Sequence, residues 1–357
     1  MKCPRCQREN YPGAKFCIGC GARLEGDDQN PARQTPDQTP AQPYPVYAAP
    51  PVQPAAQPSK AGTFFRALLH GLLYFILFFG IQSVVMFVYE FIVTLKLAGG
   101  MIPAITNGEF ESVFETLLDQ VMANLTENIH LLMILSAVLT VLVYCLSFRL
   151  RHKNPMEEMN IRPVSFIRLP AALALGLAAQ TVVSVLLTFL PLPEAWYESL
   201  AETNEMFFGG PAVIEFIDIA LLTPIIEELT FRGLVYSRLR RGMSAVWALI
   251  LSAVIFGIAH GHILSFLYAS LLGLLLAGLM TRSGNSVLVP ICCHIGFNLG
   301  SYLLAFVPDN VPVLISLFAL CLAVSVALSY LLLRRAPAAV TGADDDDDDD
   351  DDDDGNP

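Results

Sequence analysis

Charged side chains are scarce in this chain of 357 residues, because Asp, Glu, Lys and Arg together make up only 15% of it. Hydrophobic residues make up 54%, and the mean hydropathy is +0.54. Both values lie far from those of an ordinary soluble domain. This composition excludes a soluble globular protein, and we expect most of the chain to lie in a lipid bilayer.

Strongly charged stretches are also missing, with one exception at the carboxyl end. The net charge is −12, but Asp344 to Asp354 is an unbroken run of eleven aspartates, and without it the chain has 22 acidic and 21 basic side chains. We therefore assign the acidity to a disordered tail, residues 337–357, and expect no nucleic-acid partner. No secretory signal precedes the first long apolar run near Phe64, so we expect the amino terminus to stay in the cytosol.

Eight apolar segments follow a polar linker. The linker, residues 25–60, is rich in Pro, Gln and Ala, which predicts disorder. Most of the later segments have about the 20 residues that cross a bilayer. Residues 61–336 are therefore predicted to form an all-α, polytopic membrane bundle of about eight transmembrane helices. The segments are residues 64–93, 129–148, 169–190, 212–234, 245–262, 264–281, 286–306 and 311–333.

The loops predict the orientation of these segments. Basic residues follow every even-numbered segment, as in Arg149 after the second and Arg282 after the sixth. Because short cytoplasmic loops carry an excess of Lys and Arg, we expect a multi-pass protein of a bacterial cell membrane with both termini in the cytoplasm. Apolar residues from Phe110 to Leu125 recur at helical spacing, and Thr106 with Glu109 has the spacing of a capping box. They predict an amphipathic helix that lies on the membrane surface or packs against the bundle.

Half of the eight cysteines lie within the first twenty residues. Cys3 with Cys6, and Cys17 with Cys20, form two Cys-x-x-Cys pairs. Each pair brings two thiolates to one ion, and two pairs complete a tetrahedral structural zinc site. So short a segment has too little core to fold without its metal. Residues 1–24 therefore predict a zinc ribbon that holds structural Zn²⁺, and they resemble the short ribbons at the ends of many bacterial membrane proteins.

Ionisable side chains inside apolar segments are costly, and each is a candidate functional residue. Such residues and one carboxamide gather in three segments, and they are Glu227, Glu228, Arg232, His260, His294 and Asn298. Glu228 and Arg232 are spaced i, i+4 and can pair, whereas Glu227 is turned about 100° away from that partner. An unpaired carboxylate can act as a general base on water, and His and Asn side chains can donate to an oxyanion. The set predicts a peptidase without a nucleophilic Ser or Cys.

Three motifs carry a resemblance over residues 212–305. Glu227-Glu228-Leu-Thr-Phe-Arg232, Phe256-Gly-Ile-Ala-His260 and His294-Ile-Gly-Phe-Asn298 resemble the ordered EExxxR, FxxxH and HxxxN motifs of the CPBP family. This is the CAAX-protease and bacteriocin-processing (Abi) family of intramembrane endopeptidases. The resemblance implies that the first Glu and the following His hold the attacking water. It also implies that the last His and Asn support the oxyanion, and that the second Glu with the Arg supports the site.

Other readings of the same residues stay open. Glu227 or Glu228, His260 and His294 could bind a catalytic zinc with an open fourth position, although we expect no catalytic metal. A non-catalytic membrane scaffold or a proton-coupled transporter could also use such residues. The predicted spans place His260 about 22 Å from the cytosolic face but Glu227 and His294 only about 8 to 10 Å from it, so a tilted helix or a wrong boundary is expected.

The sequence also limits the partners that we expect. They are membrane lipid, a peptide or membrane-protein substrate, and a protein that binds the ribbon. We expect His70, His130, His152 and His262 to lie outside the site.

Overall fold

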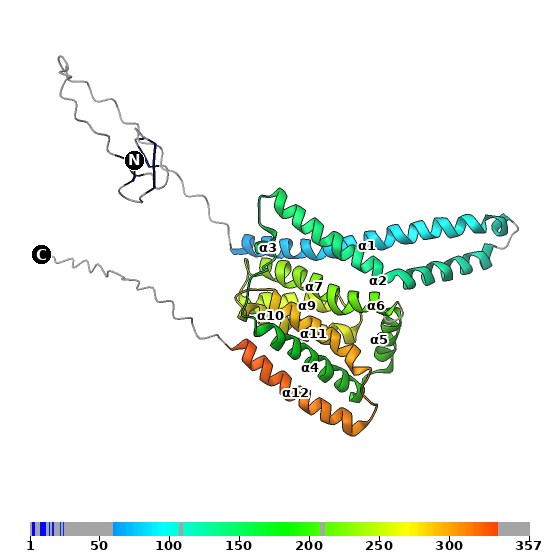
Figure 1. The fold of residues 1–357 in the computed structure, drawn as a ribbon. Helices are drawn as coiled ribbons and strands as arrows, with labels where there is room; N and C mark the ends of the chain where they lie inside the picture. The colour runs from blue at the N-terminus through cyan, green and yellow to red at the C-terminus, as the bar shows by residue number, and fades with distance from the viewer. Residues whose placement is uncertain are drawn as a thin grey trace, which may run out of the picture. The chain divides into compact units, whose positions relative to one another are not determined.

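The structure is a computed structural model that describes residues 60–106, 110–207 and 211–334, together with residues 2, 3, 8–11, 14, 16, 17, 22 and 24 of the amino-terminal segment. The chain divides into two units, Met1–Ala56 and Gln57–Pro357. In the described part of the second unit every regular element is a helix (Figure 1). The predicted all-α membrane class is confirmed.

The helices of the second unit follow the predicted apolar segments, with two additions that the sequence did not predict, α3 and α5. The elements are α1 (Lys60–Thr106), α2 (Phe110–Leu150), α3 (Pro155–Glu158), α4 (Arg168–Phe189), α5 (Glu194–Phe207), α6 (Ala212–Phe216), the π-helix η1 (Ile217–Leu222), α7 (Thr223–Glu228), the π-helix η2 (Leu229–Tyr236), α8 (Ser237–Leu239), α9 (Ala245–Ile258), α10 (Ile263–Arg282), α11 (Leu288–Leu304) and α12 (Val311–Leu333).

Five of the described helices are long and apolar enough to cross a membrane, namely α1, α2, α4, α10 and α12. Helices α9 and α11 are apolar but shorter. The fourth predicted segment is a run of short helical elements from α6 to α8, which extends to Leu239 instead of ending at residue 234. The chain is thus a multi-pass membrane protein.

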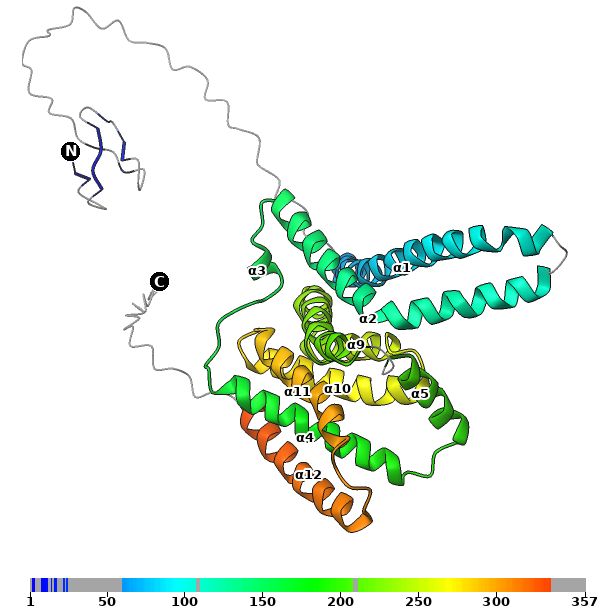
Figure 2. The ribbon, with the colours of Figure 1, turned by 45° about the vertical axis from the view of Figure 1, so that its right-hand side comes forward.

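Helices α1 and α2 form an antiparallel hairpin that projects beyond the other helices in both views (Figures 1 and 2). With 47 and 41 residues, the two helices are about 70 and 60 Å long, roughly twice the thickness of the bilayer core. The predicted separate surface helix was wrong, because residues 110–125 are the first turns of α2. Of the predicted capping box, Thr106 is the last residue of α1 and Glu109 lies outside the described residues.

The closest helix contact in the bundle joins α4 to α11, and glycines make it possible. A Cβ atom on Gly176 would lie 1.8 Å from the carbonyl oxygen of Cys293, and one on Gly296 would lie 2.1 Å from that of Leu173. Small residues allow such backbone contact between membrane helices. Helix α4 also packs against α12, so α4 lies between α11 and α12 (Figures 1 and 2). This packing fixes α11, which carries two of the predicted site residues.

The π-helix η2 lies at the centre of the bundle. Every residue from Leu229 to Tyr236 is buried, which is the pattern of a helix surrounded by protein on all sides. Phe231 contacts the rings of Phe78 in α1 and Phe256 in α9, with centroids 6.0 and 5.0 Å away. The residues just before and within η2, including the predicted glutamates and arginine, therefore lie inside the protein.

Candidate active site

The helical segment that carries the two glutamates departs from α-helical geometry before it reaches them. The backbone N–H of Thr223 donates to the carbonyl oxygen of Asp218, five residues earlier. The next residue is Pro224, which has no N–H to donate. The carbonyl of Ile219 therefore has no helical donor, and Nδ2 of Asn298 in α11 donates to it at 2.8 Å. Such π-helical turns occur frequently at functional sites.

Glu228 is the centre of a buried charge cluster. Its Oε1 atom accepts a hydrogen bond from Arg232 Nη1 at 2.7 Å, as the i, i+4 spacing predicted. The same oxygen lies 3.0 Å from Nδ1 of His294 in α11. Glu228 and Arg232 are fully buried, and His294 is 3% exposed. A buried charge must be paired and hydrogen-bonded to be tolerated, so Glu228 acts as the anchor that fixes both Arg232 and His294.

Glu227 lies on the other side of the His294 ring. Its Oε2 atom is 3.7 Å from Nε2 of His294, and its side chain is 16% exposed, in contrast to the closed environment of Glu228. This separation is too long for a direct hydrogen bond, but one water or one substrate atom can contact both groups. His294 therefore connects the two neighbouring glutamates, one through each ring nitrogen.

The ring of Phe256 joins the remaining motif residues. The guanidinium of Arg232 lies 4.1 Å from its centroid, within the range of a cation–π interaction. The rings of His260 and His294 lie 4.6 and 5.7 Å from it, both edge-on. The two imidazoles are therefore no more than about 10 Å apart. Phe256 thus acts as the apolar wall between the two histidines.

His260 lies just after α9, which ends at Ile258. Its Nδ1 atom is 2.8 Å from the carbonyl oxygen of Phe256, so Nδ1 carries the proton and donates. In the neutral form of the ring, Nε2 is then the nitrogen that can accept a hydrogen bond. In contrast, Nε2 of His262 contacts the hydroxyl of Ser265 at 2.8 Å at the start of α10. His262 therefore serves to cap a helix.

Part of the expected conflict in depth between Glu227 and His260 came from the predicted end of the fourth segment. Because the fourth segment continues to Leu239, Glu227 lies roughly 18 Å from its end at 1.5 Å per residue. Helix α9, with 14 residues, is about 21 Å long. The counted depths of Glu227 and His260 are therefore similar, but His294, which lies 3.7 Å from Glu227, is only six residues inside α11, so residue counts alone do not give the depth of the site.

Sequence reasoning missed a second buried polar cluster next to the first. Nδ1 of His130 in α2 lies 2.9 Å from Oδ2 of Asp218, and the hydroxyl of Thr223 donates to Oδ1 of Asp218 at 3.0 Å. His130 and Asp218 are 1% and 2% exposed. Their only sequence signal is a pair of opposite charges in two apolar segments. The pair fixes α2 against η1, nine residues before Glu227 in the same helical segment.

An apolar cavity of about 210 Å³ lies between α2 and α7. Ile225 and Ile226, which directly precede Glu227, line it together with residues of α2 that include Val138 and Val141. The site thus has an apolar neighbour that could receive an apolar side chain.

The structure bears on both predicted metal sites. Among the described residues no three His, Cys, Asp or Glu side chains are arranged to hold a metal ion, so the zinc-protease reading finds no ligand set in the bundle. In the first unit Cys3 and Cys17, one from each Cys-x-x-Cys pair, are buried in one cluster with Leu24. Two thiols from different pairs in one cluster fit a shared zinc ion. Cys6 and Cys20 lie outside the described residues.

Comparison with known proteins agrees with the motifs. Residues 209–300 match the model of the family described as type II CAAX prenyl endopeptidase Rce1-like, and residues 2–24 match that of the zinc-ribbon domain. Both matches agree with the family resemblance and the amino-terminal domain predicted from the sequence, and the first match indicates a peptidase. No curated protein and no solved structure matches the chain.

Proposed function

We propose that the membrane unit is an intramembrane endopeptidase in which Glu227 activates a water molecule. The observation that carries this proposal is the 3.7 Å separation between Glu227 Oε2 and His294 Nε2. It brings a carboxylate base and an imidazole donor within reach of the same reacting atom. The partial exposure of Glu227, beside the closed Glu228, supports the division of roles between them.

In the proposed reaction Glu227 takes one proton from water while the oxygen of that water bonds to the peptide carbonyl carbon. His260, through its unprotonated Nε2, accepts a hydrogen bond from the water and orients it. The carbonyl oxygen becomes an oxyanion. The C–N bond then breaks, Glu227 gives its proton to the leaving nitrogen, and a carboxylic acid and an amine are released.

The proposed oxyanion donors are His294 and Asn298. Between two carboxylates the imidazolium form of His294 can donate at both nitrogens, to Glu228 through Nδ1 and to the oxyanion through Nε2. The side-chain amide of Asn298 has two hydrogens. One is donated to the carbonyl oxygen of Ile219, and the other is available to donate to the oxyanion. Glu228 and Arg232 position His294 and do not touch the substrate.

We propose as substrate a peptide or membrane protein with an apolar segment near the cleaved bond, because the cavity beside Glu227 is apolar. Both termini would face the cytoplasm. Four thiolates, those of Cys3, Cys6, Cys17 and Cys20, would hold one zinc ion that stabilises the ribbon and takes no part in the reaction.

The test of this function compares peptides released from bacterial membrane vesicles with and without the purified protein. We expect new peptides that end at defined bonds. A vesicle peptidome that is identical in both samples would favour a scaffold or transporter instead.

A further inference from the structure

A polar cavity of about 310 Å³ lies at the end of the bundle where α2, α8 and α10 end. Its volume is at the lower end of that of small-ligand sites, which is about 300 Å³. Four arginines and two glutamates line it, namely Arg162, Arg238, Arg240, Arg241, Glu157 and Glu158. The lining therefore carries an excess of two positive charges.

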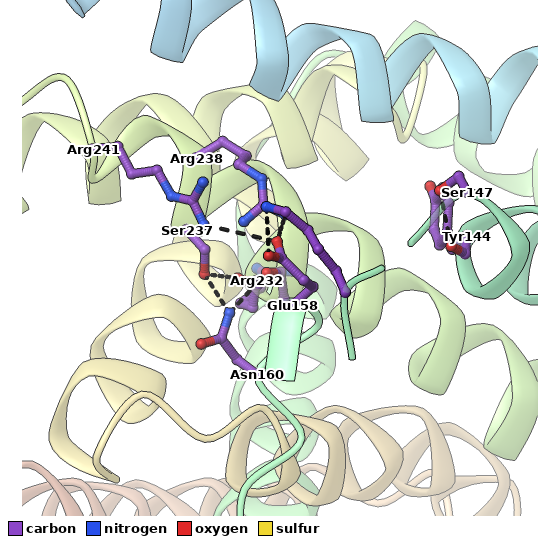
Figure 3. Close-up of polar contacts among 10 residues, drawn as sticks. Tyr144, Ser147, Glu158, Asn160, Arg232, Ser237, Arg238 and Arg241 are labelled. Atoms are coloured by element: carbon purple, nitrogen blue, oxygen red, sulfur yellow. Dashed lines mark hydrogen bonds and ion pairs between the residues drawn. The ribbon is translucent and has the colours of Figure 1, made fainter. Parts of the chain in front are cut away.

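Glu158 already has its cationic partners. Its carboxylate accepts a hydrogen bond from Lys153 at 2.8 Å. It also accepts one from Arg238 and lies 3.8 Å from Arg241 (Figure 3). These contacts join the segment after α2 to α8. Asn160 fixes the same wall, because its Nδ2 atom donates to Gly233 and Ser237 at 3.0 and 2.9 Å. The cavity is thus held by interactions that do not need a ligand.

Two of the arginines have no carboxylate partner. Arg162 is exposed, and its side chain makes no hydrogen bond or ion pair with any described residue. Arg240 donates only to the backbone carbonyl of Met243, at 3.3 Å. Two guanidinium groups on one cavity, both without a counter-charge, suit a planar or tetrahedral anion such as a phosphate group.

Exposed apolar side chains near the cavity indicate that the anion belongs to a membrane lipid. The segment between α2 and α4 forms part of the cavity wall and also carries Met156, Phe166 and Ile167, which are 52%, 82% and 73% exposed. Large apolar side chains beside basic ones are typical of a surface that rests in the interface of a membrane. The cavity would then lie at the level of the lipid headgroups.

We propose that this cavity binds the phosphate group of an anionic phospholipid, with Arg162 and Arg240 as its ligands. Glu158 pairs with other cations and provides no negative charge for these two arginines. The phosphate group would provide that charge. Basic pockets between membrane helices are known to bind such headgroups. This site is separate from the Glu227 cluster and does not rest on the proposed proteolysis.

The test measures the thermal unfolding of the full chain in detergent with soluble, short-chain lipids. Phosphatidylglycerol should raise the Tm, while phosphatidylcholine and inorganic phosphate at the same concentration should raise it much less. The double variant Arg162→Gln/Arg240→Gln should need at least about tenfold more phosphatidylglycerol for the same shift, because two charge-assisted hydrogen bonds are lost. Arg282→Gln, an exposed arginine outside the cavity lining, is the matched control and should respond like the wild type.

Each other outcome contradicts the proposal. An equal response of the double variant and the wild type would assign the effect to general surface charge. If phosphatidylcholine raised the Tm as much as phosphatidylglycerol, the cavity would have no preference for anionic lipid. If inorganic phosphate raised it as much, the cavity would be a site for the free phosphate ion.

Discussion

The side-chain amide of Asn298 donates to the backbone carbonyl of Ile219 at 2.8 Å, across the contact between α11 and η1. Pro224 explains why this carbonyl is available, since a proline five residues later cannot donate to it. One side chain thus completes the hydrogen bonds of a broken helix and lies one turn from His294. The structural role of Asn298 and its proposed catalytic role can be separated by mutation.

Asn298→Ala should lower turnover by roughly 10² to 10³, because one oxyanion donor is lost. It should also lower the free energy of unfolding by about 1 to 3 kcal/mol, because the Ile219 carbonyl loses its donor. In the double variant with Pro224→Ala a backbone N–H can take over that donor role. Stability should recover while activity stays low, as measured by thermal unfolding and proteolysis. Recovery of both would show that Asn298 is structural only.

Glu228→Gln should destabilise the protein by about 3 to 5 kcal/mol, because it leaves Arg232 without its counter-charge in the closed core. Thermal unfolding in detergent measures this. The control Glu228→Gln/Arg232→Met removes both charges and should recover most of the stability, although not the activity, since His294 still lacks its anchor. Unchanged stability of the single variant would mean that this ion pair does not hold the core.

Cys17→Ser should release one zinc ion per chain and unfold the ribbon, because three thiolates do not close the structural site. The unfolding temperature of the membrane unit should stay unchanged. Metal analysis of the purified variant, with Cys321→Ser in α12 as control, checks this. An unchanged zinc content in Cys17→Ser would refute the ribbon site.

Glu158 predicts a pH dependence at the basic end of the bundle. Partial burial would raise the pKa of its carboxyl group, but the hydrogen bond from Lys153 and the charges of Arg238, Lys153 and Arg241 together lower it below the ordinary value of 4.5. A lowered pKa means that the stabilisation is present above pH 4.5 and is lost as the pH falls through the folded-state pKa. Glu158→Gln should therefore lower the Tm at neutral pH. At a pH below the folded-state pKa of Glu158, where the carboxyl group is protonated, the variant and the wild type should have the same Tm. An equal Tm difference at every pH would contradict the ionic role.

The sequence predicted those features that depend on local spacing. The pairing of Glu228 with Arg232 follows from helical geometry alone, and the apolar segments follow from composition. The contact of His294 with Glu228 could not be predicted, because it depends on the register of two helices 66 residues apart. His130 and Asp218, 88 residues apart, were missed for the same reason.

Two errors have a physical cause that sequence patterns do not contain. Helical periodicity from Phe110 to Leu125 is the same in a separate surface helix and in a longer transmembrane helix, so the pattern could not distinguish α2 from the predicted arrangement. The fourth segment was predicted to end at residue 234, before the basic residues that follow it. In the structure Arg238 is 5% exposed and paired with Glu158, which lets the helix continue.

The most direct test of the account is the rate at which Glu227→Gln cleaves a membrane peptide that the wild type cleaves. Gln keeps the size and hydrogen bonding of the side chain but cannot take a proton, so turnover should fall by roughly 10² to 10⁴ with the Tm unchanged. Glu215→Gln, which replaces a buried glutamate of the same helical segment, should remain active. Full activity in folded Glu227→Gln would contradict the role of Glu227 as the base.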